Sequence, residues 1–478
     1  MAAAALARVL DGSCEITLVE FESIGTVGVG EATLPSLPAF HGLLGVDERD
    51  FLSTTRATFK LANQFRDWRT IGATFLHPFG SYGVDIKHEL FQAYWLKHRQ
   101  EGHPSPLEEW SVTGLAATLS RFGAPTSKDA SPLRQLSYGY HLDATLYARF
   151  LRNYAEGRGV RRIEGEVVDA RIGSNGLLDS LYLRDGRSIG ADFFIDCSGF
   201  RSLLIASALK TGYVDWSEWL PCDRAVAVEC AGSSDPLPFT QSTARESGWQ
   251  WRIPLQHRVS NGYVYSSAHL SDGEATASLF ARLEEAPLSE PRFLRFTAGR
   301  RASAWIGNCL ALGPAAGFLE PLESTGIHLA QTALARLFAL FPDRQCDPAI
   351  SAEYNRLTAL EYERVRDFLI LHYAGSQRED TPFWRHCRAM LVPESLTYKR
   401  ELFTRAGRIA MLEHETFLPA SWLAIYAGLH VWPQRYEPIV EIFGGTDLAA
   451  RLKGMRESIR RSVETLPTHS TFLNEMTS

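Results

Sequence analysis

Apolar and polar positions alternate through the middle of the chain and take a helical spacing toward its C-terminus. Residues 248–254 read Gly-Trp-Gln-Trp-Arg-Ile-Pro, and on a strand the rings of Trp249 and Trp251 would share one face. Such an aromatic pair is more often core packing than a barrier between two sites. Short strands are expected from about 220 to 300, including 262–265. The spacing of a buried helix face is found at Ile327, Ala330, Leu334, Leu337, Phe338 and Phe341.

The N-terminal part has the pattern of a nucleotide-binding unit. A short apolar strand, 15–20, ends in Glu20 and is followed by a glycine-rich stretch at 28–35. In dinucleotide-binding units the terminal acid holds ribose hydroxyls, and the glycines let the backbone approach the cofactor closely. We therefore expect Glu20 to be a ribose ligand. An ordinary glycine turn remains an alternative explanation of 28–35.

The order of the later elements predicts an α/β fold. We expect a helix over 141–154, a strand at 166–169, a hairpin around 184–187 and a buried strand at 193–196. This order resembles the FAD-binding halves of hydroxylases. The predicted architecture is a Rossmann-like, hydroxylase-type FAD module with a mixed sheet, followed by a mostly helical substrate-side module. The first module covers 1–330, with substrate-facing segments at 60–110 and 220–300, and the second covers 331–478.

A second anion-binding pattern lies at the start of the C-terminal helices. Residues 313–327 place small residues, then a carboxylate and hydroxyls, at the beginning of an apolar helix. Ser324 and Thr325 suit its cap. The free N–H groups and positive dipole of a helix start favour an anion or the negative edge of a reduced flavin. A simple cap would also explain Ser324 and Thr325, but would leave the charge of Glu323 without a purpose.

Composition excludes several classes of protein. The formal charge of the 478 residues is −6, from 49 basic and 55 acidic residues, which disfavours nucleic-acid binding. No apolar run approaches the roughly 18 residues of a membrane span. The seven cysteines form no Cys-x-x-Cys pair and indicate reduced thiols in the cytoplasm without a metal site. The alanine-rich opening lacks the basic region and cleavage site of a signal peptide.

Several strings occur in an order that resembles a known family. They are Gly28 to Pro35, Phe59-Lys60, Trp68-Arg69, Phe75 to Gly80, Asp196 to Gly199, Trp249 to Pro254 and Pro321 to Ile327. Together they resemble the flavin-dependent tryptophan halogenases, and the resemblance covers almost the whole chain. Enzymes of this family depend on FADH2. The tryptophan pair and Pro-Leu-Glu-Ser-Thr-Gly-Ile are its most specific parts.

The resemblance implies a two-component flavoprotein that oxidises chloride or bromide. A separate flavin reductase would deliver reduced FAD, which reacts with O2 to form a hydroperoxide. Halide attack would give hypohalous acid, which moves through an internal passage to a lysine. The expected substrate is a small electron-rich aromatic, an indole compound. Two alternatives stay open, an FAD-dependent aromatic monooxygenase and a catalytically impaired flavin- or indole-binding protein.

Residue by residue, the resemblance also assigns the reaction centre. Lys60, expected on a helix, would hold the halogenating species, and Glu323 would polarise it or accept the ring proton, with Ser324 beside it. An ordinary solvated helix lysine is the alternative for Lys60. The backbone of Thr325 and Gly326 would bind halide. Cofactor contacts are implied for Glu20, Ile24, Gly28, Gly30, Glu31, Ala32, Val167, Pro314 and Ile327.

The substrate side follows the family less closely. Trp249 and Trp251 would separate the flavin from the substrate, and His77 and Phe79 match an aromatic cage for an indole. Core packing is the alternative for both cage residues. In the helix expected at 421–429, the family's tryptophan users carry two tyrosines, whereas this chain has Trp422 and Leu423. The loss of their hydroxyls argues against free tryptophan as the substrate, although Trp422 is still expected at the substrate. We interpret His141, Asp143 and His257 as structural.

One further departure concerns the beginning of the sequence. Family members start with a strand and a Gly-x-Gly-x-x-Gly turn for the FAD pyrophosphate, followed by an alanine-rich helix. Residues 1–10 read as that helix alone. We therefore expect a start assigned too far downstream and weak FAD binding by the chain as written. A homodimer is possible in such a family.

Overall fold

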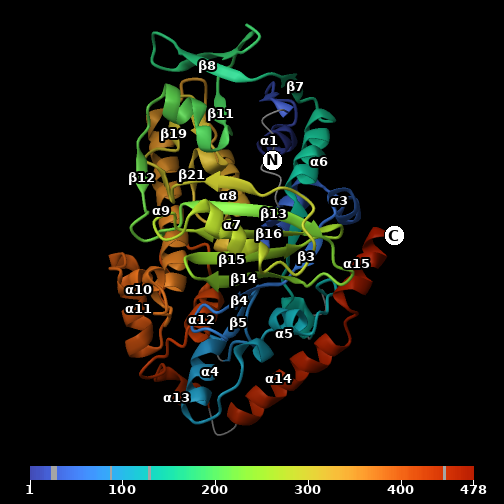
Figure 1. Ribbon diagram of the computed structural model, residues 1–478, viewed down its shortest axis with the longest axis vertical. Coiled ribbons are helices and arrows are strands. Elements are labelled where there is room, and N and C mark those ends of the chain that lie inside the picture. Colours follow the sequence, from blue (N-terminus) through green and yellow to red (C-terminus); the bar gives the residue numbers. More distant parts are fainter. Residues whose placement is uncertain (23–29, 87–88, 127–130, 445–447) are drawn as a thin grey trace. The chain divides into compact units, whose positions relative to one another are not determined.

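The computed structural model describes residues 1–22, 30–86, 89–126, 131–444 and 448–478, and has the predicted mixed α/β fold (Figure 1). Its residues form two compact units, each made of separate stretches of the chain. The first unit contains 1–57, 142–223 and 294–363, and the second contains 58–141, 224–293 and 364–478. The sequence indicates a single division of the chain, at residue 330, into two continuous modules, and that division stays a prediction.

The first unit is built from several small sheets. β1 (Thr17–Glu20) runs parallel to β7 (Arg161–Glu164), and β11 (Phe194–Asp196) runs parallel to β20 (Cys309–Ala311), which also pairs with β19 (Trp305–Ile306). The predicted hairpin is confirmed, because β9 (Leu178–Leu183) and β10 (Ser188–Gly190) pair antiparallel. The remaining strands of this unit are β2 (Gly30–Ala32), β8 (Val167–Ile172), β12 (Tyr213–Asp215), β18 (Gly299–Arg301) and β21 (Gly317–Phe318).

The turn after β11 is fixed by one buried carboxylate. Asp196 Oδ1 accepts hydrogen bonds from the backbone N–H and the hydroxyl of Ser198, at 3.0 and 2.6 Å. Its Oδ2 accepts from the N–H groups of Leu204 and Ile205, at 2.8 and 2.9 Å. Four donors on one acid tie the strand, the turn and the following helical segment together, which explains the Asp196-to-Gly199 string as a structural feature.

Five helices of the first unit are α1 (Ala2–Leu10), α2 (Ser36–Leu44), α3 (Glu48–Thr55), α6 (Ala144–Glu156) and α8 (Thr325–Ala339). α1 packs against α6, and its buried residues Ala4, Ala5 and Ala7 permit this close approach. The prediction that a helix begins at His141 was wrong. α6 begins at Ala144 because Asp143 is its N-cap and accepts hydrogen bonds from Thr145 and Leu146.

A mixed sheet forms the centre of the second unit. Six of its strands lie in the order β13-β16-β15-β14-β4-β5, and Figure 1 shows the first four side by side. Their bounds are β13 (Arg224–Ala231), β16 (Arg258–Tyr265), β15 (Gly248–Pro254), β14 (Phe239–Arg245), β4 (Ala62–Arg66) and β5 (Thr74–Pro78). β4 runs parallel to β14 and antiparallel to β5. The expected run of short strands between 220 and 300 is confirmed.

Helices cover this sheet at both ends of its strand order. α7 (Asp272–Phe280) packs on β13 and β16 through a core that includes Val226, Tyr263 and Leu279. α12 (Pro419–Gly428) packs on β5. The other helices of this unit are α4 (Phe91–Gln100), α5 (Val112–Thr118), α10 (Pro382–Ala389), α11 (Glu394–Ala406), α13 (Ile439–Gly444), α14 (Leu448–Glu464) and α15 (His469–Thr477). The boundary between the units falls within β6 (Gly139–Asp143), β17 (Arg292–Arg295) and α9 (Pro348–Ala374).

Lys60 is not on a helix as predicted. It is the last residue of a strand, β3 (Thr58–Lys60), and is fully buried. β3 pairs antiparallel with β6, so that Lys60 lies opposite Gly139 and Thr58 lies opposite His141. The alternative of a solvated lysine is therefore excluded by its burial. The short apolar string around Lys60 has no periodicity that separates a strand from a helix.

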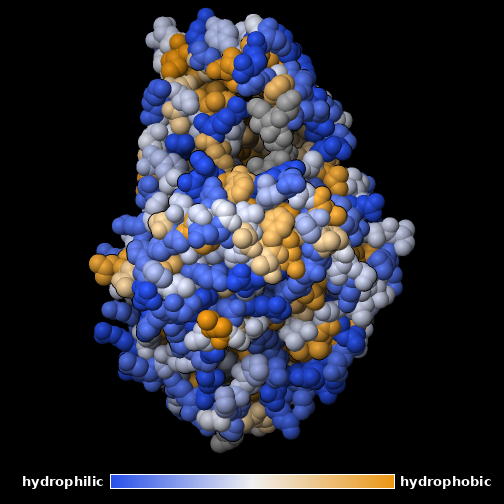
Figure 2. Space-filling model, viewed as in Figure 1, coloured by the Kyte–Doolittle hydropathy of each residue, from blue (hydrophilic) through white to orange (hydrophobic). Residues whose placement is uncertain are grey.

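In the part of the chain that the structure describes, none of the helices combines the length and the low polarity that a membrane span requires. On the face shown in Figure 2, hydrophilic side chains predominate and hydrophobic ones occur in small separate groups. All seven cysteines are free thiols, of which Cys14 and Cys197 are exposed.

Candidate functional site

The start of α8 carries a row of buried polar groups in the first unit. Glu323 and Thr325 are fully buried, and Ser324 is nearly so. Ser324 occupies the N-cap position in a left-handed conformation, φ 60°, and its side chain makes no capping hydrogen bond. The prediction of a side-chain cap from Ser324 was therefore wrong. The first N–H groups of α8 therefore receive no side-chain acceptor from the N-cap residue.

Thr325 adds a second donor at this helix start. Its Oγ1 is buried and makes no hydrogen bond within the described residues. A buried hydroxyl without a partner costs about 1–3 kcal/mol, so an acceptor bound here would remove that cost. Gly326 is exposed and leaves the backbone accessible. Together with the helix dipole, these groups suit a small anion such as halide.

The predicted helical stripe of α8 is only partly buried. Leu334 and Leu337 are core residues, whereas Phe341 lies beyond the end of the helix and is exposed. Ile327, in the first turn, is half-buried. The short helical turn containing Pro314 (Gly313–Ala315) packs against α8, so the structure brings Pro314 to the same helix as Ile327.

Glu20 lies at the end of β1, as the nucleotide-binding pattern requires. Its Oε1 accepts hydrogen bonds from Arg152, at 2.8 Å, and Arg162, at 2.5 Å. Partial burial raises the pKa of Glu20, but the hydrogen bonds from these two arginines outweigh that effect and hold the pKa below its usual value. Both bonds end on one oxygen, which leaves Oε2 as an acceptor for ribose hydroxyls.

Glu31 has the opposite electrostatic character. It lies on β2 between Gly30 and Ala32, both of which are buried. Burial raises the pKa of Glu31 to about 7. A carboxyl group that is partly protonated near neutral pH can both donate and accept hydrogen bonds, which suits a polar, uncharged edge of a cofactor.

For three other predicted cofactor residues the structure gives a strand position or no description. Val167 begins β8 and pairs with Leu183 in the sheet formed by β8, β9 and β10. Ile24 and Gly28 lie outside the described residues. The polar features of the predicted site in this unit are the acceptor on Glu20, the raised pKa of Glu31 and the Thr325 hydroxyl, which makes no hydrogen bond to a described residue.

In the second unit, Lys60 faces an aromatic ring. Its Nζ lies 5.2 Å from the centre of the Phe79 ring, within the range of a cation–π interaction. The N–H of Phe79 donates to the carbonyl of Leu61 at 2.9 Å, which holds the ring beside the lysine. This arrangement places a buried ammonium group next to an aromatic ring.

A histidine network supports the strand that carries Lys60. Thr58 Oγ1 donates to the carbonyl of Pro254 at 2.8 Å and contacts His141 Nδ1 at 3.1 Å. His141 Nε2 contacts the hydroxyl of Thr240 at 3.0 Å. Burial lowers the pKa of His141 well below its usual value, and Lys60 and His469 lower it further. His141 is therefore neutral and does not compete with the charge of Lys60. We interpreted it as structural, and no sequence pattern connects it with Lys60.

The tryptophan pair lies on a strand, as predicted. Trp249 and Trp251 belong to β15 and are both buried, and their ring centroids are 6.2 Å apart. Trp251 lies over Gly262 of the neighbouring strand, where an added Cβ would be only 2.1 Å from its ring. A wall of two rings is thus fixed by the pleat of the sheet and by a glycine opposite it.

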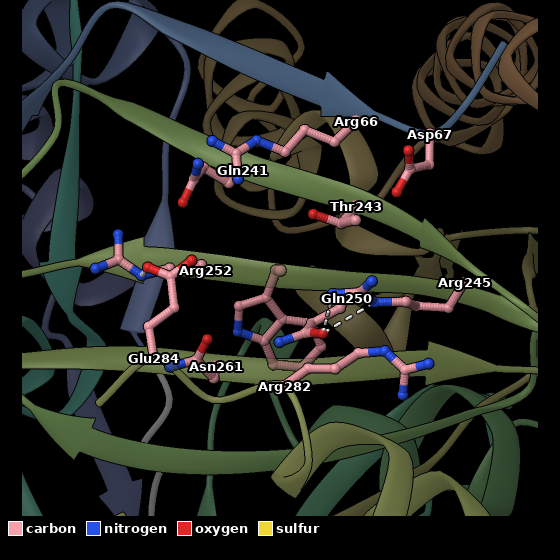
Figure 3. A pocket seen from close by; sticks show the side chains of 11 residues that line it. Arg66, Asp67, Gln241, Thr243, Arg245, Gln250, Arg252, Asn261, Arg282 and Glu284 are labelled. Atoms are coloured by element: carbon pink, nitrogen blue, oxygen red, sulfur yellow. Dashed lines mark hydrogen bonds and ion pairs between the residues drawn. The ribbon is translucent and has the colours of Figure 1, made fainter. Parts of the chain in front are cut away.

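The opposite face of the same strand is polar. Gln250 and Arg252 point into a pocket of about 210 Å³ that is also lined by Arg66, Gln241 and Asn261. In Figure 3 the Arg245 guanidinium reaches Gln250, to which it donates at 2.8 Å. Arg252 forms ion pairs with Glu284, at 3.5 Å, and Glu285. Successive side chains of β15 point to opposite faces of the sheet. One face therefore carries the two tryptophan rings, and the other carries polar side chains that form ion pairs with neighbouring residues.

The expected aromatic cage is split between a ring beside Lys60 and a buried cluster. His77, on β5, lies 5.7 Å from the ring of Phe368 and 6.2 Å from that of Phe417. Trp422 is fully buried, its ring is 5.0 Å from Phe368, and its N–H donates to the carbonyl of Phe417. Since that N–H is already bonded, Trp422 could present only its ring to a substrate. Phe79 is the predicted cage residue that contacts Lys60.

Within the described residues, no group of three or more histidine, cysteine, aspartate or glutamate side chains could hold a metal ion. The polar features of the first unit instead suit a nucleotide and an anion. A strand-terminal acid and a buried polar helix start in an α/β fold are typical of nucleotide-binding oxidoreductases. The comparisons with known proteins narrow this class to one family.

The chain belongs to the tryptophan halogenase family, which matches residues 1–444. Among its relatives, tryptophan 7-halogenase RebH of Lentzea aerocolonigenes is 33% identical over 99% of this chain and 96% of its own length. The solved structure of BrvH, a flavin-dependent halogenase from Brevundimonas sp. BAL3, is 45% identical and covers 100% of this chain and 96% of its own, with a TM-score of 0.95. Xcc4156, a flavin-dependent halogenase from Xanthomonas campestris, is 44% identical, with coverage of 99% and 95% and a TM-score of 0.95.

These matches establish the activity class. The chain is a flavin-dependent halogenase, an oxidoreductase that uses FADH2, O2 and halide and acts on a small aromatic substrate with a separate flavin reductase. The two alternatives, a monooxygenase and an impaired binding protein, are not favoured, because halogenases match the chain over its whole length.

Proposed function

We propose that this halogenase transfers halogen to an indole-like aromatic at Lys60, with Glu323 as the second catalytic group. The observation that carries this proposal is the fully buried ammonium of Lys60 against the ring of Phe79. A buried amine beside an aromatic ring suits the capture of a small, reactive oxidant. Burial keeps such an oxidant from escaping into bulk solvent and reacting there with other molecules.

When bound, the reduced flavin together with O2 supplies the oxidising equivalent that turns halide into an electrophilic halogenating species. The chain's own residues hold the reactants. In the first unit the backbone of Thr325 and Gly326, aided by Thr325 Oγ1, would bind halide at the start of α8. Glu323, fully buried two residues earlier, would polarise the halogenating species or accept the proton released from the aromatic ring.

In the second unit Lys60 Nζ would donate a hydrogen bond to the halogenating species. The neutral state of His141 favours this role, since a second cation beside Lys60 would drive its proton off. Trp249 and Trp251 would form the barrier that keeps the substrate away from the flavin, so that oxygen is not inserted directly. Phe79 would stack on the aromatic substrate, with His77 and Trp422 behind it.

The substrate that fits best is an indole compound other than free tryptophan. The position of the tyrosine pair is occupied by Trp422 and Leu423, which are both buried and carry no hydroxyl group. The relative RebH is a tryptophan 7-halogenase, but this chain lacks the two phenolic donors that would hold an amino-acid carboxylate there. Recognition at the cage would then depend on the ring alone.

The decisive experiment combines the chain with a flavin reductase, FAD, NADH, bromide and a panel of indoles, and reads the products by mass spectrometry. We expect a bromine atom in indole or a substituted indole and none when bromide is omitted. Hydroxylated products with no halogen would overturn the proposal. If none of the indoles is converted when bromide and reduced FAD are both present, that result would also count against an indole substrate.

We also propose a cytoplasmic location and the absence of a nucleic-acid partner. The seven free thiols and the net charge of −6 support these two proposals. A homodimer remains part of the proposal, and analytical ultracentrifugation of the purified protein would test it.

A further inference from the structure

We propose that a second pocket, within the second unit, binds an aromatic molecule that carries a carboxylate. The pocket has a volume of about 390 Å³ and is formed by α4, the segment 69–76, the segment 104–108 and the end of α12 with the residues after it. It contains neither Lys60 nor Trp249. The proposal does not depend on the proposed function, because it concerns ligand binding and can be measured without turnover.

Two tryptophans form the walls of this pocket. The ring centroids of Trp95, on α4, and Trp432, after α12, are 6.0 Å apart and their planes are inclined by 45°. Phe75 lies at the floor, directly against Gly428, where an added Cβ would be 2.2 Å from its ring. The glycine therefore permits the close contact that shapes the floor. Large, rigid aromatic walls are typical of sites that bind planar ligands.

Three potential cations converge on the same pocket. Arg99 lies one helical turn after Trp95 on α4, and its guanidinium is 3.7 Å from the centre of the Trp432 ring. Arg69 Nη1 donates to the imidazole of His430. Burial lowers the pKa of His430, and Arg69 and Arg99 lower it further. In the described part of the chain neither arginine forms an ion pair with a carboxylate, so their positive charge is not neutralised.

Two N–H donors at this pocket have no acceptor among the described residues. Trp95 is 1% exposed and its Nε1 is buried without a hydrogen bond, and the same holds for Nε of Arg69. Each such group costs about 1–3 kcal/mol when left unbonded. A ligand that brings an acceptor into the pocket would remove this cost. The unbonded donors are therefore an observation, independent of the charge, that points to an anionic or strongly accepting ligand.

A carboxylate on an aromatic ring satisfies both requirements. Its oxygens accept from guanidinium and indole N–H groups in charge-assisted hydrogen bonds, while the ring packs against the aromatic side chains that line the pocket. Glu108 is the acid that lines the pocket, and it accepts the N–H of Leu76 at 3.3 Å. Its presence disfavours a ligand with a second negative charge and suits a ring N–H donor such as that of an indole.

The test is isothermal titration calorimetry on the full chain with probes that differ only in charge. Indole-3-acetate is compared with indole-3-acetamide, which has the same ring and arm, and with acetate, which lacks the ring. We expect indole-3-acetate to bind about ten- to hundredfold more tightly than the amide, and acetate to bind more weakly than either. Arg69→Gln and Arg99→Gln should each remove most of the preference for the acid, and the double variant should abolish it.

Matched controls separate recognition from folding. Arg344→Gln removes an exposed arginine of the first unit and should leave the preference unchanged. Trp95→Phe keeps a ring and removes only the unbonded N–H, so it provides a second variant if an arginine variant unfolds. Thermal unfolding of every variant checks the fold. A preference for the acid that survives in the double arginine variant would overturn the proposal, as would equal affinity of the wild-type chain for acid and amide.

A crystallographic experiment locates the ligand directly. Crystals soaked with 5-bromoindole-3-acetate should show anomalous bromine density in the pocket that Trp95 and Trp432 line. Bromine density found only at another place would refute the assignment of this pocket. Failure of this proposal leaves halogenation of indole by the wild-type chain unaffected, and the mass-spectrometric assay for that activity is a separate measurement.

Discussion

Lys60 Nζ lies 5.2 Å from the centre of the Phe79 ring, with both residues buried in the second unit. The two side chains are held together by backbone hydrogen bonds of neighbouring residues, since the N–H of Phe79 donates to the carbonyl of Leu61. An ammonium group beside an aromatic face can hold a small oxidant close to a stacked aromatic acceptor. The first prediction tests that geometry.

Lys60→Met should abolish halogenation without loss of flavin binding. Methionine fills the space of the lysine side chain, so the buried strand β3 should remain packed. We expect product formation to fall by a factor on the order of 10³ or more, measured by mass spectrometry, with unchanged flavin affinity measured by fluorescence. Lys453→Met, at an exposed position of α14, is the matched control. Full activity of the Lys60 variant would exclude Lys60 as the transfer site.

Glu323→Gln should lower the rate of halogenation while leaving the protein folded. The change keeps the size of a fully buried side chain and removes its ability to accept a proton. Loss of a general acid–base group lowers the rate by a factor on the order of 10²–10⁴, which steady-state kinetics would measure. Glu353→Gln, at a partly exposed position of α9, provides the comparison. A rate equal to that of the wild-type chain would show that Glu323 is only structural.

Thr325→Val should weaken the affinity for halide. Valine has the shape of threonine but lacks the buried hydroxyl, whose oxygen makes no hydrogen bond to a described residue. A lost hydrogen bond to a charged group corresponds to an increase of about ten- to hundredfold in the KM for bromide. The kcat at saturating bromide should change much less. If the hydroxyl does not contact halide, the KM for bromide will be the same in both proteins.

Gly262→Ala should displace Trp251 and destabilise the second unit. An added Cβ would lie 2.1 Å from the Trp251 ring, and overpacking of this kind costs about 1–3 kcal/mol in the free energy of unfolding. We expect chemical denaturation to show that loss. We also expect a smaller fraction of the oxidised flavin to yield halogenated product. Gly273→Ala, on α7, has open space around its Cβ and should not destabilise. Equal stability of the two variants would contradict the role of Gly262.

The stability of the protein should fall as the pH is lowered from 6.5 to 5. Burial lowers the pKa of His469 to about 4, so the unfolded state binds a proton in this range and the folded state does not. Each pKa unit corresponds to about 1.4 kcal/mol, which gives a loss on the order of 2 kcal/mol at pH 5. His469→Gln should reduce the dependence, measured by denaturation at each pH.

The control for this pH experiment is His386→Gln, which removes an exposed imidazole. The contribution of His469 to stability is complete above the unfolded pKa of histidine and decreases below it. An unchanged pH dependence in the His469→Gln variant would show that burial does not lower the pKa of His469.

Local patterns in the sequence were sufficient for features that depend on neighbouring residues. The common face of Trp249 and Trp251 follows from the two-residue period of a strand, and β15 confirms it. The helix that begins at Thr325 was expected from its apolar spacing, although its cap was not. The family resemblance, carried by short motifs, was confirmed over residues 1–444.

Only the tertiary structure decided features that depend on residues distant in the sequence. Lys60 was expected on a helix and lies on a buried strand, because its pairing with β6 outweighs an ambiguous local pattern. His141 is tied to Thr58 through a strand pairing that no spacing reveals. The pocket that Trp95 and Trp432 line likewise requires four separate segments to meet. The spacing of apolar residues and the local composition report on a few neighbouring residues. Burial, pKa shifts and pockets arise only when segments distant in the sequence pack together and exclude water.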